Sequence, residues 1–168
     1  MRTWRDVFNS RQLLELKVYQ EELLRISREK KLNLTMSLLL AVTIDKIVDY
    51  STSLCRWVPG GEFAAATLGG EKKLPMMWDY VELVPHNTGP GSWSSMVGWI
   101  ERVLVHFSNS SLERGTVVQA DATIPWLPSD SVDVMITDPP YYDAIWYGDL
   151  GDLFSVWLRR SVSLLGLE

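Results

Sequence analysis

The sequence predicts an α/β fold in which a mainly helical region, residues 1–111, precedes a strand–crossover–strand–helix region, residues 112–168. Three observations predict this fold. Apolar residues recur at helical spacing over the first fifty positions, two short β-branched runs follow position 115, and a helical pattern closes the chain. A chain of 168 residues buries roughly 70% of the surface that its unfolded form exposes, so one core can hold without a disulfide.

Two helices are expected in the first third. Apolar residues from Leu13 to Ile26 recur at spacings of three and four, and Asn9 or Ser10 can cap the start of this helix. A second helix, from about Leu34 to Cys55 after Asn33 as its cap, is apolar on nearly all sides, which predicts burial. Because the polar connection is short, we expect the two helices to pack antiparallel.

The middle of the sequence changes from irregular to helical. Glycine and proline punctuate an irregular loop section near 59–91, for which Met76–Tyr80 is the expected aromatic anchor. Ser92 can cap a helix that ends near Asn109, and apolar spacing after Tyr147 predicts a last amphipathic helix.

Two strands are expected between these last helices. Thr116–Ala120 is a β-branched run that ends at Asp121, and Val132–Thr137 is a second run that ends at Asp138. About 17 positions separate the two aspartates, enough for a short crossover. The spacing therefore predicts parallel neighbours in one sheet.

Charge and composition exclude several classes of protein. The net charge is −5, divided into +2 for the first fifty residues and −7 for the rest, which is not the balance of a protein that binds nucleic acid through bulk charge. The longest apolar stretch, Leu34 to Ile44, is too short to span a bilayer. A single cysteine, Cys55, fits a reducing compartment, so we expect a cytosolic protein. A function must therefore be read from a site.

One motif carries chemistry, the run Asp138-Pro139-Pro140-Tyr141 directly after the second expected strand. The Asp138 carboxylate and the Pro139 carbonyl can each accept one N–H of an exocyclic base amine, while the prolines stiffen the turn and offer no competing donor. Two such hydrogen bonds localise the nitrogen lone pair for attack on a methyl sulfonium, and they strengthen as positive charge develops. Tyr141 supplies a ring on which an extruded base can stack.

Plainer interpretations of this run exist. It could be a turn that only ends a strand, and Asp121 could only cap a following helix. Pro139–Tyr142 also satisfies the P-P-x-Y pattern that adaptor domains bind in polyproline conformation, although such ligands lie in exposed segments and this run follows an apolar one.

The sequence around the motif resembles a known family. Asp138-Pro139-Pro140-Tyr141 is similar to the D-P-P-Y motif of S-adenosylmethionine-dependent amino methyltransferases that act on adenine N6 or cytosine N4 in DNA. The longer run from Thr137 to Ile145 resembles the DUF1156-type adenine-specific DNA methylases. Further segments that resemble that family are Trp4, Phe8, Arg11–Leu14, Pro75-Met76, Trp78–Tyr80, Gly91–Trp93, Tyr147, Asp149-Leu150 and Val156–Leu158.

The resemblance implies a partial Rossmann-like methyltransferase sheet, S-adenosyl-L-methionine as the methyl donor and DNA as the substrate. It implies that Asp138, Pro139, Pro140 and Tyr141 hold the target amine and that Asp121 accepts from the adenine amino group of the methyl donor. Tyr142, Asp143 and Trp146 are the expected further contacts to the substrate.

One part of the family pattern has no counterpart. Gly60-Gly61 and Gly69-Gly70 follow no strand, and Gly89-Pro90-Gly91 precedes a helix without one, so the glycine-rich cofactor loop is missing. The chain is therefore expected to be the distal part of a longer methylase whose upstream part carries that loop. Cytosine N4 or an RNA base amine such as guanine N2 remain alternative targets, and a non-catalytic helical interaction domain is the alternative of another class.

Overall fold

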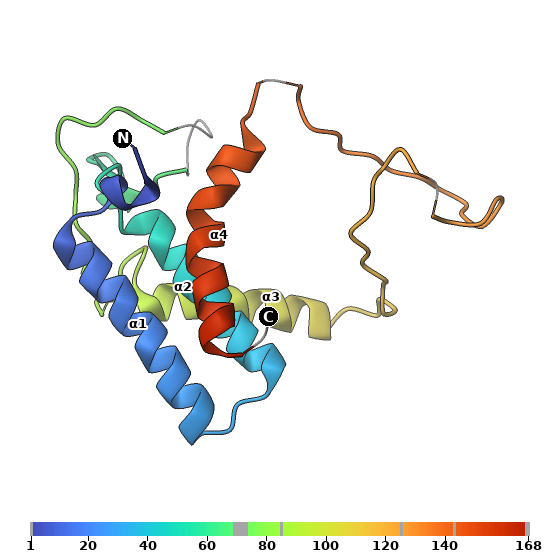
Figure 1. The fold of residues 1–168 in the computed structure, drawn as a ribbon, viewed down its shortest axis with the longest axis horizontal. Coiled ribbons are helices and arrows are strands. Elements are labelled where there is room, and N and C mark those ends of the chain that lie inside the picture. Colours follow the sequence, from blue (N-terminus) through green and yellow to red (C-terminus); the bar gives the residue numbers. More distant parts are fainter. Residues whose placement is uncertain (1, 69–73, 85, 125, 143, 167–168) are drawn as a thin grey trace.

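The computed structural model describes residues 2–68, 74–84, 86–124, 126–142 and 144–166. Within these ranges the chain forms four α-helices, one short 3-10 helix and one pair of strands (Figure 1). In chain order the elements are η1 (Trp4–Val7), α1 (Ser10–Glu29), α2 (Leu34–Tyr50), β1 (Arg56–Val58), β2 (Phe63–Ala65), α3 (Trp93–Ser108) and α4 (Tyr147–Leu164).

Polar caps fix where three of the helices begin. Asn9 rather than Ser10 caps α1, and its side chain and that of Gln12 each accept the other's backbone N–H at 2.9 Å. Asn33 caps α2 and Ser92 caps α3, each by accepting the backbone N–H three residues further on. The predicted caps are confirmed, because side-chain acceptors at these positions satisfy N–H groups that have no partner within the helix.

Helix α2 lies at the centre of the fold, in contact with α1, α3 and α4 (Figure 1). The core that they share is built from Leu16, Ile44, Ile47, Val48, Met96 and Leu153, all nearly inaccessible to solvent. The antiparallel pairing of α1 and α2 is confirmed (Figure 1). The predicted burial of α2 holds for its second half but not for its first turn, where Leu34 and Met36 are exposed.

A buried amide joins α1 to α4. The Gln20 side chain is 1% exposed, and its Nε2 donates to the Trp157 carbonyl at 2.9 Å and to Ser161 Oγ at 3.0 Å. The Trp157 ring meets Phe8 edge to face, with ring centroids 5.5 Å apart. These contacts fix the last helix against the first, although more than a hundred residues separate them in the sequence.

The section after α2 differs in two ways from its expected irregular course. Strands β1 and β2 form a short antiparallel hairpin that the sequence pattern missed. Within the expected aromatic anchor Met76–Tyr80, Trp78 is 94% exposed. Tyr80 of the same segment makes the attachment to α1, because its hydroxyl accepts from Asn9 Nδ2 at 3.0 Å, and Glu82 adds an ion pair with Arg11 at 2.6 Å.

The predicted α/β fold is wrong. The described chain is mostly helical, with a two-stranded antiparallel sheet in place of a Rossmann-like parallel one. Thr116–Ala120 and Val132–Thr137 form no strands; they run through a segment that leaves the helical body and returns to it (Figure 1). A strand needs a neighbour for its backbone N–H and C=O groups, and neither run has one here. Consequently Val117 is 98% exposed and Ile136 is 91% exposed.

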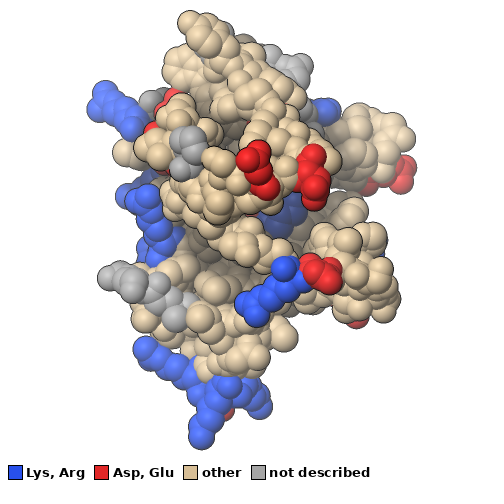
Figure 2. Space-filling model, turned by 90° about the vertical axis from the view of Figure 1, so that its right-hand side faces the viewer, with Lys and Arg blue, Asp and Glu red and all other residues tan. Residues whose placement is uncertain are grey.

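Apolar side chains are also exposed on the second half of α3. They are Trp99, Val103, Leu104, Val105 and Phe107. The face of the molecule that carries the projecting segment shows few charged side chains over most of its area (Figure 2). In the described part of the chain no helix has both the length and the hydropathy needed to cross a membrane.

One carboxyl group lies in the interior without a hydrogen bond. Asp45 on α2 is 9% exposed, and its Oδ1 has no partner among the described residues. Burial disfavours the charged form and raises the pKa of Asp45 to about 7. The folded protein therefore holds this proton more tightly than the unfolded chain does.

Stability is expected to fall as the pH rises from about 4 to about 7, the window between the ordinary and the raised pKa of Asp45. Each unit of pKa difference corresponds to about 1.4 kcal/mol, so the fall amounts to a few kcal/mol. Urea unfolding at several pH values measures it. Asp45→Asn should flatten the profile between pH 5 and pH 7, whereas Asp152→Asn, at an exposed carboxyl on α4, should leave it unchanged. Equal profiles for Asp45→Asn and the parent protein would contradict this assignment.

Candidate functional site

The Asp138–Tyr141 run lies near the end of the segment between α3 and α4, where the chain turns back toward the helical body (Figure 1). The Asp138 side chain is exposed, and no hydrogen bond or ion pair joins it to a described residue. The carbonyl of Pro139 likewise accepts no hydrogen bond from a described residue. Both acceptors are therefore open to an incoming donor.

A tight turn follows the two prolines. The Tyr142 N–H donates to the Pro140 carbonyl at 2.9 Å, and the Ala144 N–H donates to the Tyr141 carbonyl at 2.9 Å. Tyr142 adopts a φ of 48°, a left-handed conformation that is uncommon outside glycine. Since proline fixes its own φ and restricts the residue before it, the chain from Asp138 into this turn is stiff.

Tyr141 faces a hollow on the helical body, which we call the Tyr141 pocket. Its volume is about 620 Å³, and its wall comes from α2, the chain after β2, the start of α4 and Tyr141 itself. The lining side chains that matter for binding are Lys46, Tyr50, Tyr141, Tyr147, Leu150 and Phe154. Burial, reinforced by the Asp49 charge, raises the pKa of Tyr50 and keeps its hydroxyl neutral. Four aromatic rings with one amine and the Asp49 carboxylate, which also lines the pocket, suit a flat, polar ring system.

The other expected substrate contacts lie elsewhere. Tyr142 and Trp146 line a separate shallow hollow beside the first turn of α4. Both are exposed, Trp146 to 66%, and the Trp146 carbonyl accepts the Leu150 N–H at the helix start. Asp143 lies outside the described residues. The structure therefore brings Tyr142 and Trp146 together but separates them from the Tyr141 pocket.

Asp121 lies on the exposed outer part of the same segment. Its Oδ1 accepts the Thr123 backbone N–H at 2.8 Å and the Thr123 hydroxyl at 2.7 Å, and these hydrogen bonds lower the pKa of Asp121. No helix follows, so Asp121 orders a local turn instead of capping one. Asp121 lines neither the Tyr141 pocket nor the hollow beside Tyr142 and Trp146.

The described residues do not fit a complete site for S-adenosyl-L-methionine. Asp121 is exposed and does not line the aromatic pocket. Gly60-Gly61 does follow a strand, β1, contrary to the expectation from the sequence, but it lies in the turn of the antiparallel β1–β2 hairpin and not between a strand and a helix. Across these same residues, no group of three or more His, Cys, Asp or Glu side chains could hold a metal ion. What the arrangement offers is a pair of open acceptors beside an aromatic hollow.

Sequence reasoning missed the helical half of the pocket. Lys46 and Tyr50 share one side of α2, four residues apart, and Tyr147 and Phe154 lie seven apart on α4. Those spacings place each pair on one face of its helix. The same spacing is equally typical of core residues, so only the fold could show that these faces meet Tyr141.

Comparison with known proteins returned no relationship. No family model matches the sequence, and no curated protein sequence and no solved structure shows a significant match to it.

The projecting segment should be cut first by trypsin. Arg114 is exposed and is the one lysine or arginine between Arg102 and Arg159, so cleavage in the segment can be assigned without ambiguity. Mass spectrometry of short digests should detect a cut at Arg114 before any cut at Arg28, which is held within α1. An Arg114→Gln variant is the control and should lose that early product. Equal resistance of Arg114 and Arg28 would show that the segment packs on the helical body.

Proposed function

We propose that this chain supplies the part of an S-adenosylmethionine-dependent DNA methyltransferase that holds the target amine, with adenine N6 as the amine methylated. The proposal rests on one observation, the open pair of acceptors at Asp138 and Pro139 in a corner stiffened by proline, directly before Tyr141 and its pocket. The resemblance of the run Asp138–Tyr141 to the D-P-P-Y motif supports the same assignment.

The chemistry that this corner supports is capture of an NH₂ group. One N–H donates to the Asp138 carboxylate and the other to the Pro139 carbonyl, and neither proline competes as a donor. Both hydrogen bonds favour a tetrahedral nitrogen with a localised lone pair, which alkylation requires. The two hydrogen bonds become strongest when positive charge develops on the nitrogen, so the acceptors stabilise the transition state more than the bound substrate.

The Tyr141 pocket is the proposed place for the extruded base. A base amine inside a duplex is shielded, so the nucleotide must leave the stack. Tyr141 and Phe154 offer ring faces, and Lys46 is exposed at the wall and can meet a flanking phosphate. The pocket and the corner are contiguous in the chain, which lets the base stack while its amine reaches the acceptors.

The methyl donor requires a further part of the methylase. Since the described residues do not fit a donor site, we assign donor binding to an upstream part of the same methylase that carries the glycine-rich loop. The apolar side chains exposed on α3 and at Val117 and Ile136 support such a partner, because burying them on it is favourable. Because the proposed substrate is DNA, we also propose a cytosolic location for the protein.

A helical interaction module is the second candidate. The mostly helical fold and the exposed apolar half of α3 favour it over an isolated enzyme. In that case the Asp138 corner is only a turn, and its substitution changes no reaction rate. The two candidates therefore differ in whether methyl transfer depends on the Asp138 side chain.

Asp138→Ala should reduce methyl transfer about a hundredfold to a thousandfold, the usual cost of one lost preorganised hydrogen-bonding group. The measurement is incorporation of labelled methyl groups into DNA by this chain joined to its cofactor-binding part. Asp133→Ala is the matched control, since Asp133 is an exposed carboxyl on the same segment. Circular dichroism should show unchanged folding in both variants, because neither side chain is buried.

Equal incorporation by Asp138→Ala and the parent protein would reject the assigned role and favour the interaction module. Mass analysis of the digested product identifies the base. N6-methyladenine supports the proposal as stated, whereas N4-methylcytosine in DNA, or methylated bases found only with RNA substrates, would replace its target.

A further inference from the structure

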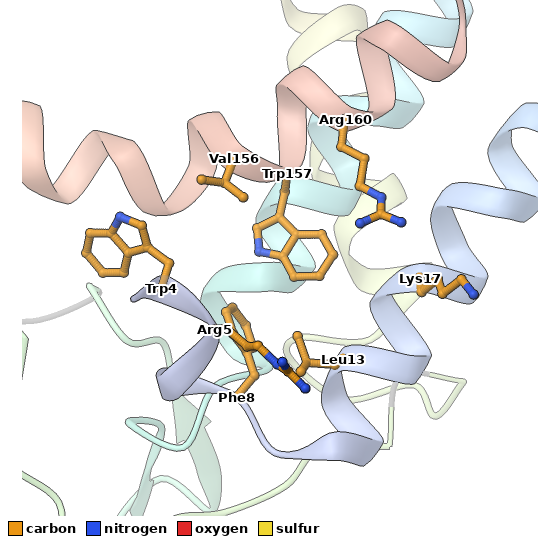
Figure 3. Close-up of a pocket in the computed structure, with 8 residues that line it drawn as sticks. All are labelled: Trp4, Arg5, Phe8, Leu13, Lys17, Val156, Trp157 and Arg160. Atoms are coloured by element: carbon orange, nitrogen blue, oxygen red, sulfur yellow. The ribbon is translucent and has the colours of Figure 1, made fainter. Parts of the chain in front are cut away.

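A second pocket lies between α4 and the N-terminal segment (Figure 3). We call it the Trp157 pocket; its volume is about 330 Å³. Its lining residues are aromatic or aliphatic at the floor, namely Trp4, Phe8, Leu13, Val156 and Trp157, and cationic at the rim, namely Arg5, Lys17 and Arg160.

The three rim cations differ in how far they are neutralised. Arg5 and Arg160 form no ion pair or side-chain hydrogen bond with any described residue, and Lys17 has an exposed ion pair with Glu21 at 3.4 Å. None of the described residues that line the pocket carries a carboxylate. Figure 3 shows the Arg160 side chain reaching from α4 into the space between α4 and α1, with the Arg5 guanidinium on the side of Leu13 and the Lys17 amine pointing away from Trp157. The rim is therefore a local positive field on a protein of negative net charge.

The floor offers one accessible ring to a planar ligand, that of Trp4, because Phe8 is 9% exposed and Trp157 is 8% exposed. Trp157 projects from α4 toward Phe8 and is held there by the edge-to-face contact, while Trp4 lies under Val156 (Figure 3). Trp4 is only partly buried, so a flat ring can be received beside it. Aromatic rings next to unpaired guanidinium groups are the combination that binds single-stranded nucleic acid, in which bases stack and phosphates pair with arginine.

We infer that the Trp157 pocket binds one unpaired nucleotide of a DNA strand. The base stacks against Trp4 over a floor closed by Trp157, and the phosphate is held by Arg5 and Arg160. The inference deepens the proposed function and rests on it for the choice of DNA as the polyanion. Because Phe154 of the Tyr141 pocket and Trp157 lie less than one helical turn apart on α4, a single strand crossing this helix can occupy both pockets.

Binding of fluorescein-labelled oligodeoxythymidine, measured by anisotropy at several salt concentrations, tests this inference on the chain alone. The double variant Arg5→Ala/Arg160→Ala should bind at least tenfold more weakly and should show a shallower salt dependence. The matched control is Arg2→Ala/Arg159→Ala, which removes two exposed arginines outside the pocket lining and should change affinity much less.

Stacking is tested separately from charge. Trp4→Ala should weaken binding of the thymidine strand severalfold but hardly change binding of an abasic strand of equal length, whereas Trp78→Ala, at an exposed tryptophan outside the pocket, should affect neither. Polyglutamate serves as a polyanion without bases. Circular dichroism and urea unfolding of each variant separate lost binding from lost folding.

No binding by the parent chain, equal affinities for both arginine pairs, or equal affinity for polyglutamate would each overturn the inference. The two proposals fail separately, because thymine carries no exocyclic amine for Asp138 and Pro139 to hold, so binding of the thymidine strand does not depend on the site of methyl transfer. If methyl transfer depends on Asp138 but strand binding does not depend on Arg5 and Arg160, this inference alone is wrong. If strand binding depends on Arg5 and Arg160 but methyl transfer does not depend on Asp138, the proposed function alone is wrong.

Discussion

Burial of α2 is the constraint on which the rest of the structure depends. Ile44, Ile47 and Val48 in the second half of this helix are removed from water because three other helices pack against it. One of these helices, α4, comes from the far end of the chain. The segment between α3 and α4 must therefore leave the body and return to it, and Gln20 fastens the returning helix from inside.

The return of the chain to the helical body determines where Asp138 and Pro139 lie. The start of α4 is fixed against α2, so the residues just before it are brought to the helical body, and Tyr141 closes a pocket there. Asp138 and Pro139 remain outside, where their acceptors have no competing partner among the described residues. A stiff proline turn between the two regions transmits the fixed position of the helix to the acceptors. The same helix carries Trp157 three residues after Phe154, so α4 contributes to the walls of both pockets.

The sequence predicted the helices well because their signals are local. Caps at Asn9, Asn33 and Ser92 and the spacing of apolar residues depend only on neighbours within a turn or two. The strands at Thr116–Ala120 and Val132–Thr137 failed because a β-branched run becomes a strand only beside a partner, which the run itself does not specify. For the same reason the pocket wall at Tyr50 and Phe154 could not be foreseen, since it arises where two distant helix faces meet.

Amide hydrogen exchange tests most directly whether α2 is the buried element that organises the chain. The account predicts that amides around Ile44–Val48, and those of α4 near Leu153 that pack on them, exchange most slowly, at rates set by global unfolding. Amides of Thr116–Ala120 and Val132–Thr137 should exchange at rates close to those of an unfolded chain. Slow exchange in these two runs, or faster exchange in the second half of α2 than at the ends of α1, would contradict the account.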